Sequence, residues 1–283
     1  MKQTAIILLL FVVSFVSKAQ MSDSIVINLS DGEKPARMYV FPADKDNNKH
    51  RAVVICPGGG YSRLAMDHEG FKWVPFFREE GFTTVILEYR MPKGNPLIPV
   101  GDAAKAILTV RANAGQWDID PQQVGIMGFS AGGHLASTIT VTTDSTVRPS
   151  FSVLMYPVVS MHEDFMHRRS HKELLGADAS DETNRRYSAY LHVDSLTPPT
   201  FIALSSNDAG VPPQNSLRFY EAMVVAKRPV AIHAWPTGSH GWGMSGKLPY
   251  HQEMLGELRA WLRRTVGVKP KVWKSKAAAK QPQ

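Results

Sequence analysis

The stretch Gly128-Phe129-Ser130-Ala131-Gly132 has the form G-x-S-x-G. It follows the apolar run 124–127 and precedes the small-residue run 133–137, which is the pattern of a strand, a sharp turn and a helix. In that arrangement the serine occupies strained backbone and points its hydroxyl out of the fold. Glycines are needed on both sides because a Cβ there would collide with the neighbouring strand and helix. The stretch therefore predicts Ser130 as a nucleophile.

Apolar runs rich in β-branched residues alternate with helix-length segments along the chain. Strands are expected over 24–29, 37–41, 52–56, 83–87, 124–129, 152–155, 200–204 and 230–234, and helices over 72–80, 102–114, 133–141, 213–226 and 250–265. This alternation indicates an α/β fold, a doubly wound, mostly parallel sheet with helices on both faces. Active sites in such sheets lie beyond the carboxyl ends of the strands.

A glycine-rich loop follows the strand that ends at Cys56. It reads Pro57-Gly58-Gly59-Gly60-Tyr61, and three glycines allow backbone amides to turn inward. We expect this loop to form an oxyanion hole together with the Ala131 amide, with Gly58 and Gly59 as candidate donors. An ordinary glycine turn and a phosphate-binding loop are the alternatives. Pro57 and the lack of a following Lys-Ser/Thr argue against the phosphate-binding loop.

A serine nucleophile needs a base, and the base needs a carboxylate to orient it. In this type of fold the chain order is serine, acid, histidine. Asp208 comes just after the strand at 200–204, and His240 lies in a glycine-flanked loop after the strand at 230–234. The other histidines fit less well: His134 is expected to pack, His233 lies within a strand and His251 opens the last helix.

These segments together resemble α/β-hydrolases of the acetyl esterase and lipase group, in particular the small esterases related to carbohydrate acetyl- and feruloyl-esterases. The matching segments are 57–61, 68–70, 89–90, 118–121, 128–136, 174–176, 208–216 and 239–241. The resemblance implies that Ser130 is the nucleophile, Asp208 the orienting acid and His240 the base. It also implies that the oxyanion amides come from Ala131 and from the loop glycines Gly58 and Gly59, without deciding which of the two glycines contributes.

The chain departs from that group at two positions. Asn207 stands where relatives often carry a second aspartate, which does not affect the three catalytic positions. Arg169 stands where relatives often carry glycine, in the loop after the strand at 152–155. If that loop lines the substrate cleft, Arg169 alters the substrate preference.

The expected reaction is hydrolysis of short-chain, chiefly acetyl, esters on a carbohydrate through an acyl-enzyme. No apolar lid is visible in the connection 158–197, which argues against a lipase for long acyl chains. A lactone or dienelactone hydrolase and a serine peptidase remain alternatives, whereas a binding protein would be expected to have lost Ser130 or His240. Tyr61, His68 and Trp242 are candidates for a sugar-binding wall, with simple packing as the alternative.

The first nineteen residues have the features of a secretory signal. Lys2 provides the positive end, residues 6–13 form a short apolar core, and Ser17-Lys18-Ala19 is a small-x-small cleavage site. The apolar run is too short for a spanning helix, so an uncleaved membrane anchor is the weaker interpretation. We expect a signal peptide over 1–19, one catalytic domain over 20–268, and export to the periplasm or the exterior without membrane insertion.

The net charge of +7 comes from the two ends of the chain. Lysines of the signal and of the segment 269–283 account for all of it, so residues 20–268 are neutral. A neutral body is not a nucleic-acid-binding surface, and the basic tail is expected to be disordered. Neither a cofactor nor a metal is expected. Cys56 is interpreted as a buried strand residue, and His167 and His171, spaced i, i+4, as a solvated surface face.

Overall fold

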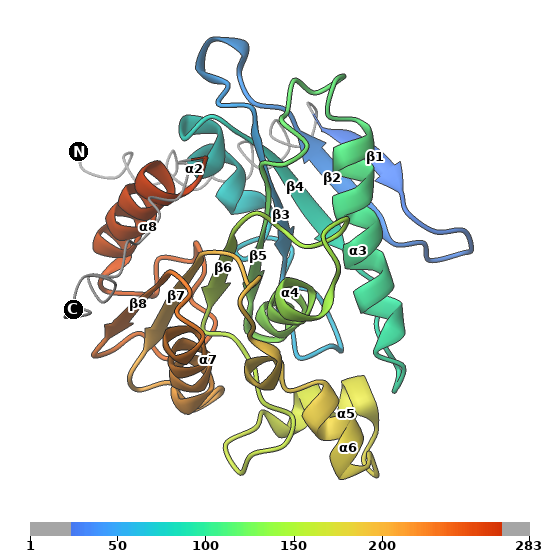
Figure 1. Ribbon diagram of the computed structural model, residues 1–283, viewed down its shortest axis with the longest axis vertical. Coiled ribbons are helices and arrows are strands. Elements are labelled where there is room, and N and C mark those ends of the chain that lie inside the picture. The colour runs from blue at the N-terminus through green and yellow to red at the C-terminus, as the bar shows by residue number, and fades with distance from the viewer. Residues whose placement is uncertain (1–23, 268–283) are drawn as a thin grey trace, which may run out of the picture.

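The computed structural model describes residues 24–267, so the expected signal peptide and basic tail lie outside the described residues. Eight strands form one sheet in the order β1-β2-β4-β3-β5-β6-β7-β8 (Figure 1). Their bounds are β1 (Ile25–Asn28), β2 (Arg37–Phe41), β3 (Arg51–Cys56), β4 (Phe82–Glu88), β5 (Val124–Phe129), β6 (Ser152–Met155), β7 (Thr200–Ser205) and β8 (Val230–Trp235).

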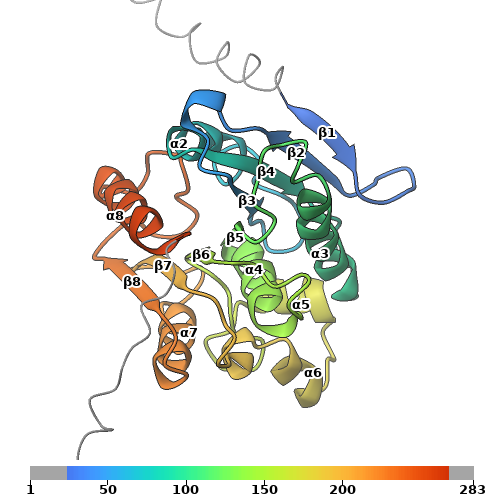
Figure 2. The ribbon, with the colours of Figure 1, turned by 45° about the horizontal axis from the view of Figure 1, so that its top comes forward.

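The sheet is mostly parallel. Strands β3 to β8 run parallel to one another, and β1 and β2 form an antiparallel edge against β4 (Figure 2). The helical segments are η1 (Lys45–Asn47), η2 (Phe71–Trp73), α2 (Val74–Glu79), α3 (Leu97–Ala112), α4 (Ser130–Thr142), α5 (Arg168–Leu175), α6 (Asp181–Arg186), η3 (Ala189–His192), α7 (Gln214–Val225) and α8 (His251–Thr265). The expected doubly wound sheet is confirmed.

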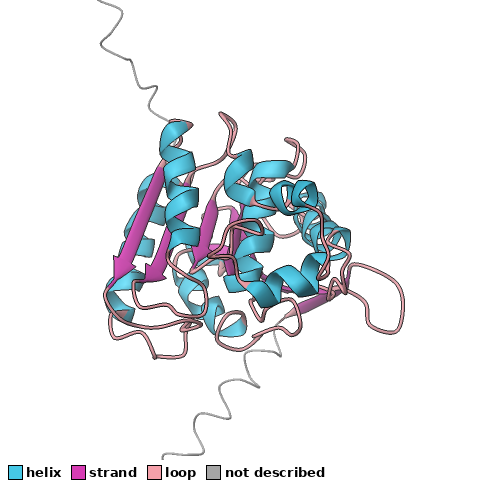
Figure 3. Ribbon diagram, turned by 90° about the horizontal axis from the view of Figure 1, so that it is seen from below, coloured by secondary structure: helices cyan, strands magenta, loops and turns pink. Residues whose placement is uncertain are grey.

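Helices cover both faces of the sheet (Figure 3). Side chains of α3, α4 and α7 pack on one face, and those of α2 and α8 pack on the other. Coverage of both faces explains why the sequence of the central strand β3 is continuously apolar. Val54 belongs to the core beneath α3, α4 and α7, whereas Val53 and Ile55 belong to the core beneath α2 and α8. Successive side chains of a strand point to opposite faces, so a strand covered on both sides must be apolar at every position.

The start of one predicted helix is corrected by the structure. Helix α3 begins at Leu97 rather than at 102, because Pro99 lies in its first turn, where a missing N–H costs no helical hydrogen bond. The connection 158–197 contains α5, α6 and η3. Within residues 24–267, no helix combines the length and the apolar character required to cross a bilayer.

Candidate active site

Ser130 lies at the sharp turn between β5 and α4, with a backbone φ of 52°. This left-handed conformation is rare for a residue with a side chain and marks a strained position. The turn is tight, and two of its glycines lie very close to other backbone atoms. A Cβ on Gly128 would lie 2.1 Å from the carbonyl oxygen of Gly132, and one on Gly132 would lie 2.1 Å from that of Cys56. The predicted collision with the neighbouring strand and helix is present at both glycines.

The structure brings Ser130, His240 and Asp208 together, although 110 residues separate the serine from the histidine. The His240 Nδ1 donates to Asp208 Oδ2 at 2.7 Å, which leaves Nε2 to accept from the Ser130 hydroxyl at 2.8 Å. The buried Asp208 carboxylate also accepts from the backbone amides of Gly210 and Val211, at 2.9 and 2.8 Å. These hydrogen bonds fix the position of the carboxylate. The carboxylate can therefore hold the imidazole in the orientation that a general base requires.

The glycine-rich loop lies beside Ser130, but its amides differ in availability. The Gly58 amide donates to the buried carboxylate of Glu69 at 2.8 Å, so it is engaged away from the serine hydroxyl. Gly59 lines the cavity that contains Ser130. Ala131 is the second residue of α4, where the N–H has no carbonyl within the helix to accept it. The candidate oxyanion donors accordingly narrow from Gly58, Gly59 and Ala131 to Gly59 and Ala131.

Glu69 connects the glycine-rich loop to the histidine loop. Its Oε1 accepts from the Tyr156 hydroxyl at 2.8 Å, and that hydroxyl in turn accepts from the Gly243 amide at 2.9 Å. The Tyr156 ring packs edge-on against His240, with ring centroids 4.9 Å apart. Burial, reinforced by the charge of Glu69, raises the pKa of Tyr156, so the hydroxyl remains a donor. One buried carboxylate thus holds segments on two sides of the site.

No sequence pattern predicts a role for Glu69 or Tyr156. Glu69 lies within the segment 68–70 that carries the resemblance, without a role of its own. Tyr156 follows β6 directly, and this strand-end position is the signal that would have identified it, as it identified Asp208. Its φ of 37° is a second sign of a functional position, because bulky residues rarely adopt left-handed backbone.

Two of the three expected sugar contacts are wrong. Tyr61 is 1% exposed, and its hydroxyl contacts the Nδ1 of the buried His134 at 2.8 Å. Trp242 is completely buried and donates through Nε1 to Ser205 at 3.1 Å. Both rings fill the core, so neither can face a sugar. His68, the third candidate, lines the cavity as expected.

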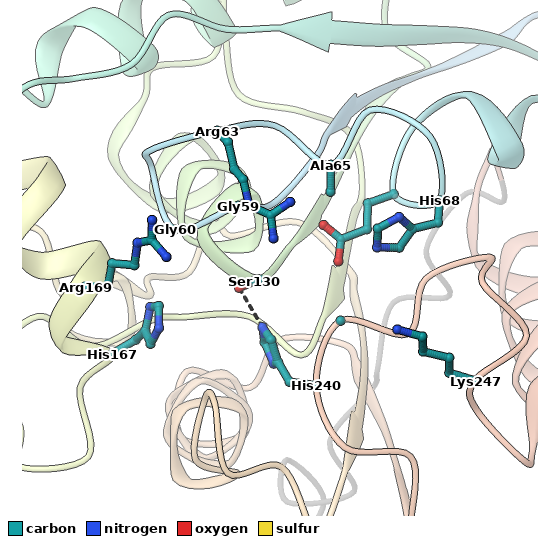
Figure 4. A pocket seen from close by; sticks show the side chains of 12 residues that line it. Gly59, Gly60, Arg63, Ala65, His68, Ser130, His167, Arg169, His240 and Lys247 are labelled. Carbon is teal, nitrogen blue, oxygen red and sulfur yellow. Dashed lines mark hydrogen bonds between the residues drawn. The ribbon is translucent and has the colours of Figure 1, made fainter.

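The cavity above Ser130 has a volume of about 380 Å³, and more than half of its lining residues carry charged or imidazole side chains (Figure 4). Its lining residues are Gly59, Gly60, Arg63, Ala65, His68, Glu69, Ser130, His167, Arg169, His240, Gly241 and Lys247. Arg169 is one of these residues, so its loop lines the cavity. The connection between β6 and β7 thus forms one wall of the cavity through His167 and Arg169.

The interpretation of His167 and His171 as a solvated face is wrong. His171 is buried and contacts the Asn184 side-chain oxygen through Nε2 at 2.7 Å. His167 caps α5, where its Nδ1 accepts from the Ser170 amide, and its ring points toward the cavity in Figure 4. Burial, with smaller contributions from the charges of His240 and Arg169, lowers the pKa of His167. Among residues 24–267, no group of three or more potential ligands could hold a metal ion.

Other expectations for histidine and cysteine agree with the structure. His134 packs as expected, His233 lies in β8 and His251 is the first residue of α8. Cys56 is fully buried, and burial raises the pKa of its thiol far above the usual range. An inert thiol in the core accounts for this cysteine.

The BD-FAE family model matches residues 38–223. The chain belongs to the BD-FAE family. An acetylxylan esterase from Xylanibacter ruminicola is 38% identical over 258 residues, which make up 90% of this chain and 53% of that protein. The endo-1,4-beta-xylanase B of Butyrivibrio fibrisolvens is 33% identical over 211 residues, or 69% of this chain and 33% of that protein. This BD-FAE chain therefore spans about half or less of these two relatives.

The comparison with solved structures agrees with the family assignment. The acetyl ester-xyloside bifunctional hydrolase from Caldicellulosiruptor lactoaceticus superposes with a TM-score of 0.78 at 31% identity. The superposition covers 85% of this BD-FAE chain and 96% of that protein. The resemblance to α/β-hydrolases of the esterase group is confirmed, together with the fold that it implied.

Proposed function

We propose that this protein is a serine esterase that hydrolyses short-chain esters, chiefly acetyl esters carried by a carbohydrate. The observation that carries the proposal is the continuous hydrogen-bonded path from Asp208 through His240 to the Ser130 hydroxyl. The acetylxylan esterase relative and the acetyl ester-xyloside hydrolase structure support acetylated carbohydrate as the substrate class.

Each step of the reaction follows from this geometry. His240 Nε2 removes the hydroxyl proton as Ser130 Oγ attacks the ester carbonyl, and the backbone amides of Gly59 and Ala131 stabilise the developing oxyanion. The tetrahedral intermediate collapses, and the alcohol leaves with the proton held by His240. A water molecule, deprotonated by His240, then attacks the acyl-enzyme and releases the carboxylic acid and the free serine.

The lining of the cavity supports a short acyl group. Ala65 is the one apolar side chain among the lining residues, so an alkyl chain long enough to extend beyond Ser130 would desolvate charged and imidazole groups without forming hydrogen bonds. An acetyl group exposes little apolar surface and fits beside Ser130 without that cost. The β6–β7 connection contributes polar residues to the cavity wall.

A substrate series on the purified protein tests the proposal. We expect 4-nitrophenyl acetate and acetylated xylan to be hydrolysed, with rates falling steeply as the 4-nitrophenyl acyl chain lengthens. Ser130→Ala should remove turnover and retain the circular dichroism and melting temperature of the wild type. Turnover confined to long-chain esters would indicate a lipase, turnover confined to a lactone or a peptide amide would indicate one of the other hydrolases, and full activity in Ser130→Ala would exclude the mechanism.

We also propose that the protein is exported. The support is the pattern of the first nineteen residues, namely Lys2, the short apolar run and the small-x-small site before Gln20. Determination of the mature N-terminus after expression in a secreting bacterial host tests this proposal. A chain that begins at or near Gln20 outside the cytoplasm is expected, and an intact chain retained in the cytoplasm would contradict it.

A further inference from the structure

Three cationic side chains surround the opening of the active-site cavity. Arg63, Arg169 and Lys247 line it, and all three are exposed (Figure 4). No ion pair within residues 24–267 involves any of them. The one acidic side chain in the lining, Glu69, is buried and already accepts hydrogen bonds on both oxygens. The opening therefore carries three cationic side chains that form no ion pair within the described residues, against one buried carboxylate.

The two arginines are held close to the reacting groups by contact with the glycine-rich loop. A Cβ on Gly60 would lie 3.2 Å from Arg169 Cδ, and one on Gly59 would lie 3.1 Å from Arg63 Cγ. The arginine stems thus rest on the two glycines next to the proposed oxyanion site, in space that a larger residue would occupy. The positive charge of Arg169 also helps to lower the pKa of the His167 imidazole, which lines the same cavity.

The position of these cations assigns them to one half of the ester. The acyl carbonyl must enter between Ser130, Gly59 and Ala131, and Ser130 is only 5% exposed. The alcohol half of the ester must then project toward the opening, where Arg63, Arg169 and Lys247 lie. These cations can therefore contact the carbohydrate and not the acetyl group.

We propose that Arg63, Arg169 and Lys247 select acetyl esters on carbohydrates that carry a carboxylate, that is, O-acetylated uronic acid residues. The proposal rests on the esterase function proposed above. A guanidinium can form two parallel hydrogen bonds to one carboxylate, so Arg169 and Arg63 suit a planar uronate group better than a neutral sugar hydroxyl. His167 adds a neutral donor, because its Nδ1 accepts from Ser170 and its proton is then on Nε2.

The test compares two substrates that differ in one charge. These are an O-acetylated methyl galacturonoside and the same compound with its carboxylate converted to a carboxamide, with acetate release as the readout. For the wild type at low salt, we expect kcat/KM to be about tenfold higher for the carboxylate. The preference should shrink toward unity as the salt concentration is raised to about 1 M, because screening weakens exposed charge pairs.

Arg169→Gln should lower the ratio of the two kcat/KM values by about fivefold, the magnitude of one exposed charge pair. Arg63→Gln should act in the same direction. Arg168→Gln is the matched control, since Arg168 is the exposed neighbour on α5 that does not line the cavity, and it should leave the ratio at the wild-type value.

Two kinds of result would overturn the inference. Equal kcat/KM values for the two substrates in the wild type would show that the cavity does not recognise the carboxylate. Equal decreases of the kcat/KM ratio in Arg168→Gln and Arg169→Gln would show the same. In either case, hydrolysis of 4-nitrophenyl acetate by the same preparation leaves the proposed esterase function standing. If the wild type hydrolyses neither the sugar esters nor 4-nitrophenyl acetate, the esterase function fails, and this inference fails with it.

Discussion

The hydroxyl of Tyr156 donates a 2.8 Å hydrogen bond to Oε1 of Glu69, and both side chains are buried beneath the active site. The other oxygen of Glu69 accepts from the Gly58 amide, so the carboxylate fixes the glycine-rich loop relative to a tyrosine that packs on His240. The glycine-rich loop and the base are thus positioned by one residue whose hydrogen bonds go to Gly58 and Tyr156 rather than to Ser130, His240 or Asp208.

Glu69→Gln should therefore reduce both stability and turnover. Each carboxylate oxygen receives a hydrogen bond, whereas an amide offers a single oxygen, so one donor would lose its acceptor in the buried site. We expect the free energy of unfolding to fall by about 1–3 kcal/mol and kcat for 4-nitrophenyl acetate to fall by about tenfold. Urea unfolding and steady-state kinetics measure the two effects.

Glu88→Gln is the control for Glu69→Gln. Glu88 also accepts from a tyrosine hydroxyl, that of Tyr39 at 2.8 Å, but it does not line the cavity that contains Ser130. This variant should retain wild-type kcat. A wild-type kcat in Glu69→Gln would show that the link between the two loops does not position the catalytic groups.

Asp208→Asn should decrease kcat by about three to four orders of magnitude with little change in melting temperature. The asparagine amide can donate to His240 Nδ1, which moves the imidazole proton to Nε2 and leaves that nitrogen unable to accept the serine proton. Asp67→Asn, which alters an exposed ion pair with Lys72, serves as the control and should remain active. More than a tenth of the wild-type kcat in Asp208→Asn would contradict the assigned role of this carboxylate.

Alanine at two glycines should have opposite effects on stability. In Gly128→Ala the new Cβ would lie 2.1 Å from the carbonyl oxygen of Gly132, so we expect a loss of about 3 kcal/mol or more, or failure to fold. In Gly256→Ala, within α8, no atom lies within 4 Å of the new Cβ, and helix propensity should add about 0.5–1 kcal/mol. Urea unfolding of both variants measures the difference, and equal stabilities would contradict the described packing of the turn.

Acid should destabilise the protein through His134. Burial lowers the pKa of this histidine from 6.5 to about 4, so between these pH values the unfolded chain binds a proton that the folded chain does not. The resulting stabilisation is complete above pH 6.5 and is lost as the pH falls toward 4, by roughly 3 kcal/mol in all.

The slope of unfolding free energy against pH measures this effect. His134→Gln, which does not titrate, should flatten the slope between pH 6.5 and 4 even where it lowers stability overall. His50→Gln, which removes an exposed imidazole, provides the control and should keep a slope close to that of the wild type. An unchanged slope in His134→Gln would assign the acid sensitivity to other groups.

The sequence predicted well those features that depend on a local pattern of residues. Strand β5 follows from an apolar run. The turn at Ser130 follows from glycines at positions where other backbone lies too close for a Cβ. Asp208 and His240 could be found because each follows a strand, and strand ends in a parallel sheet converge.

The features that the sequence did not predict depend on side-chain direction and on contacts between distant segments. Trp242 and Tyr61 flank the site in sequence, but whether a ring near a glycine faces the core or the cavity depends on packing that no local pattern encodes. The pairing of Glu69 with Tyr156 joins residues 87 positions apart. His167 and His171 shared a helical spacing, yet one caps α5 and the other is buried.

The connection between β6 and β7 has a consequence for how such an enzyme diversifies. It places His167 and Arg169 in the cavity wall, while the nucleophile, acid and base lie on other strand ends. Under the proposed function, exchange of α5 between relatives would change which carbohydrate is accepted and leave Ser130, Asp208 and His240 in place. A library randomised only at the cavity-facing positions of that helix is the natural starting point for engineering new substrate preferences.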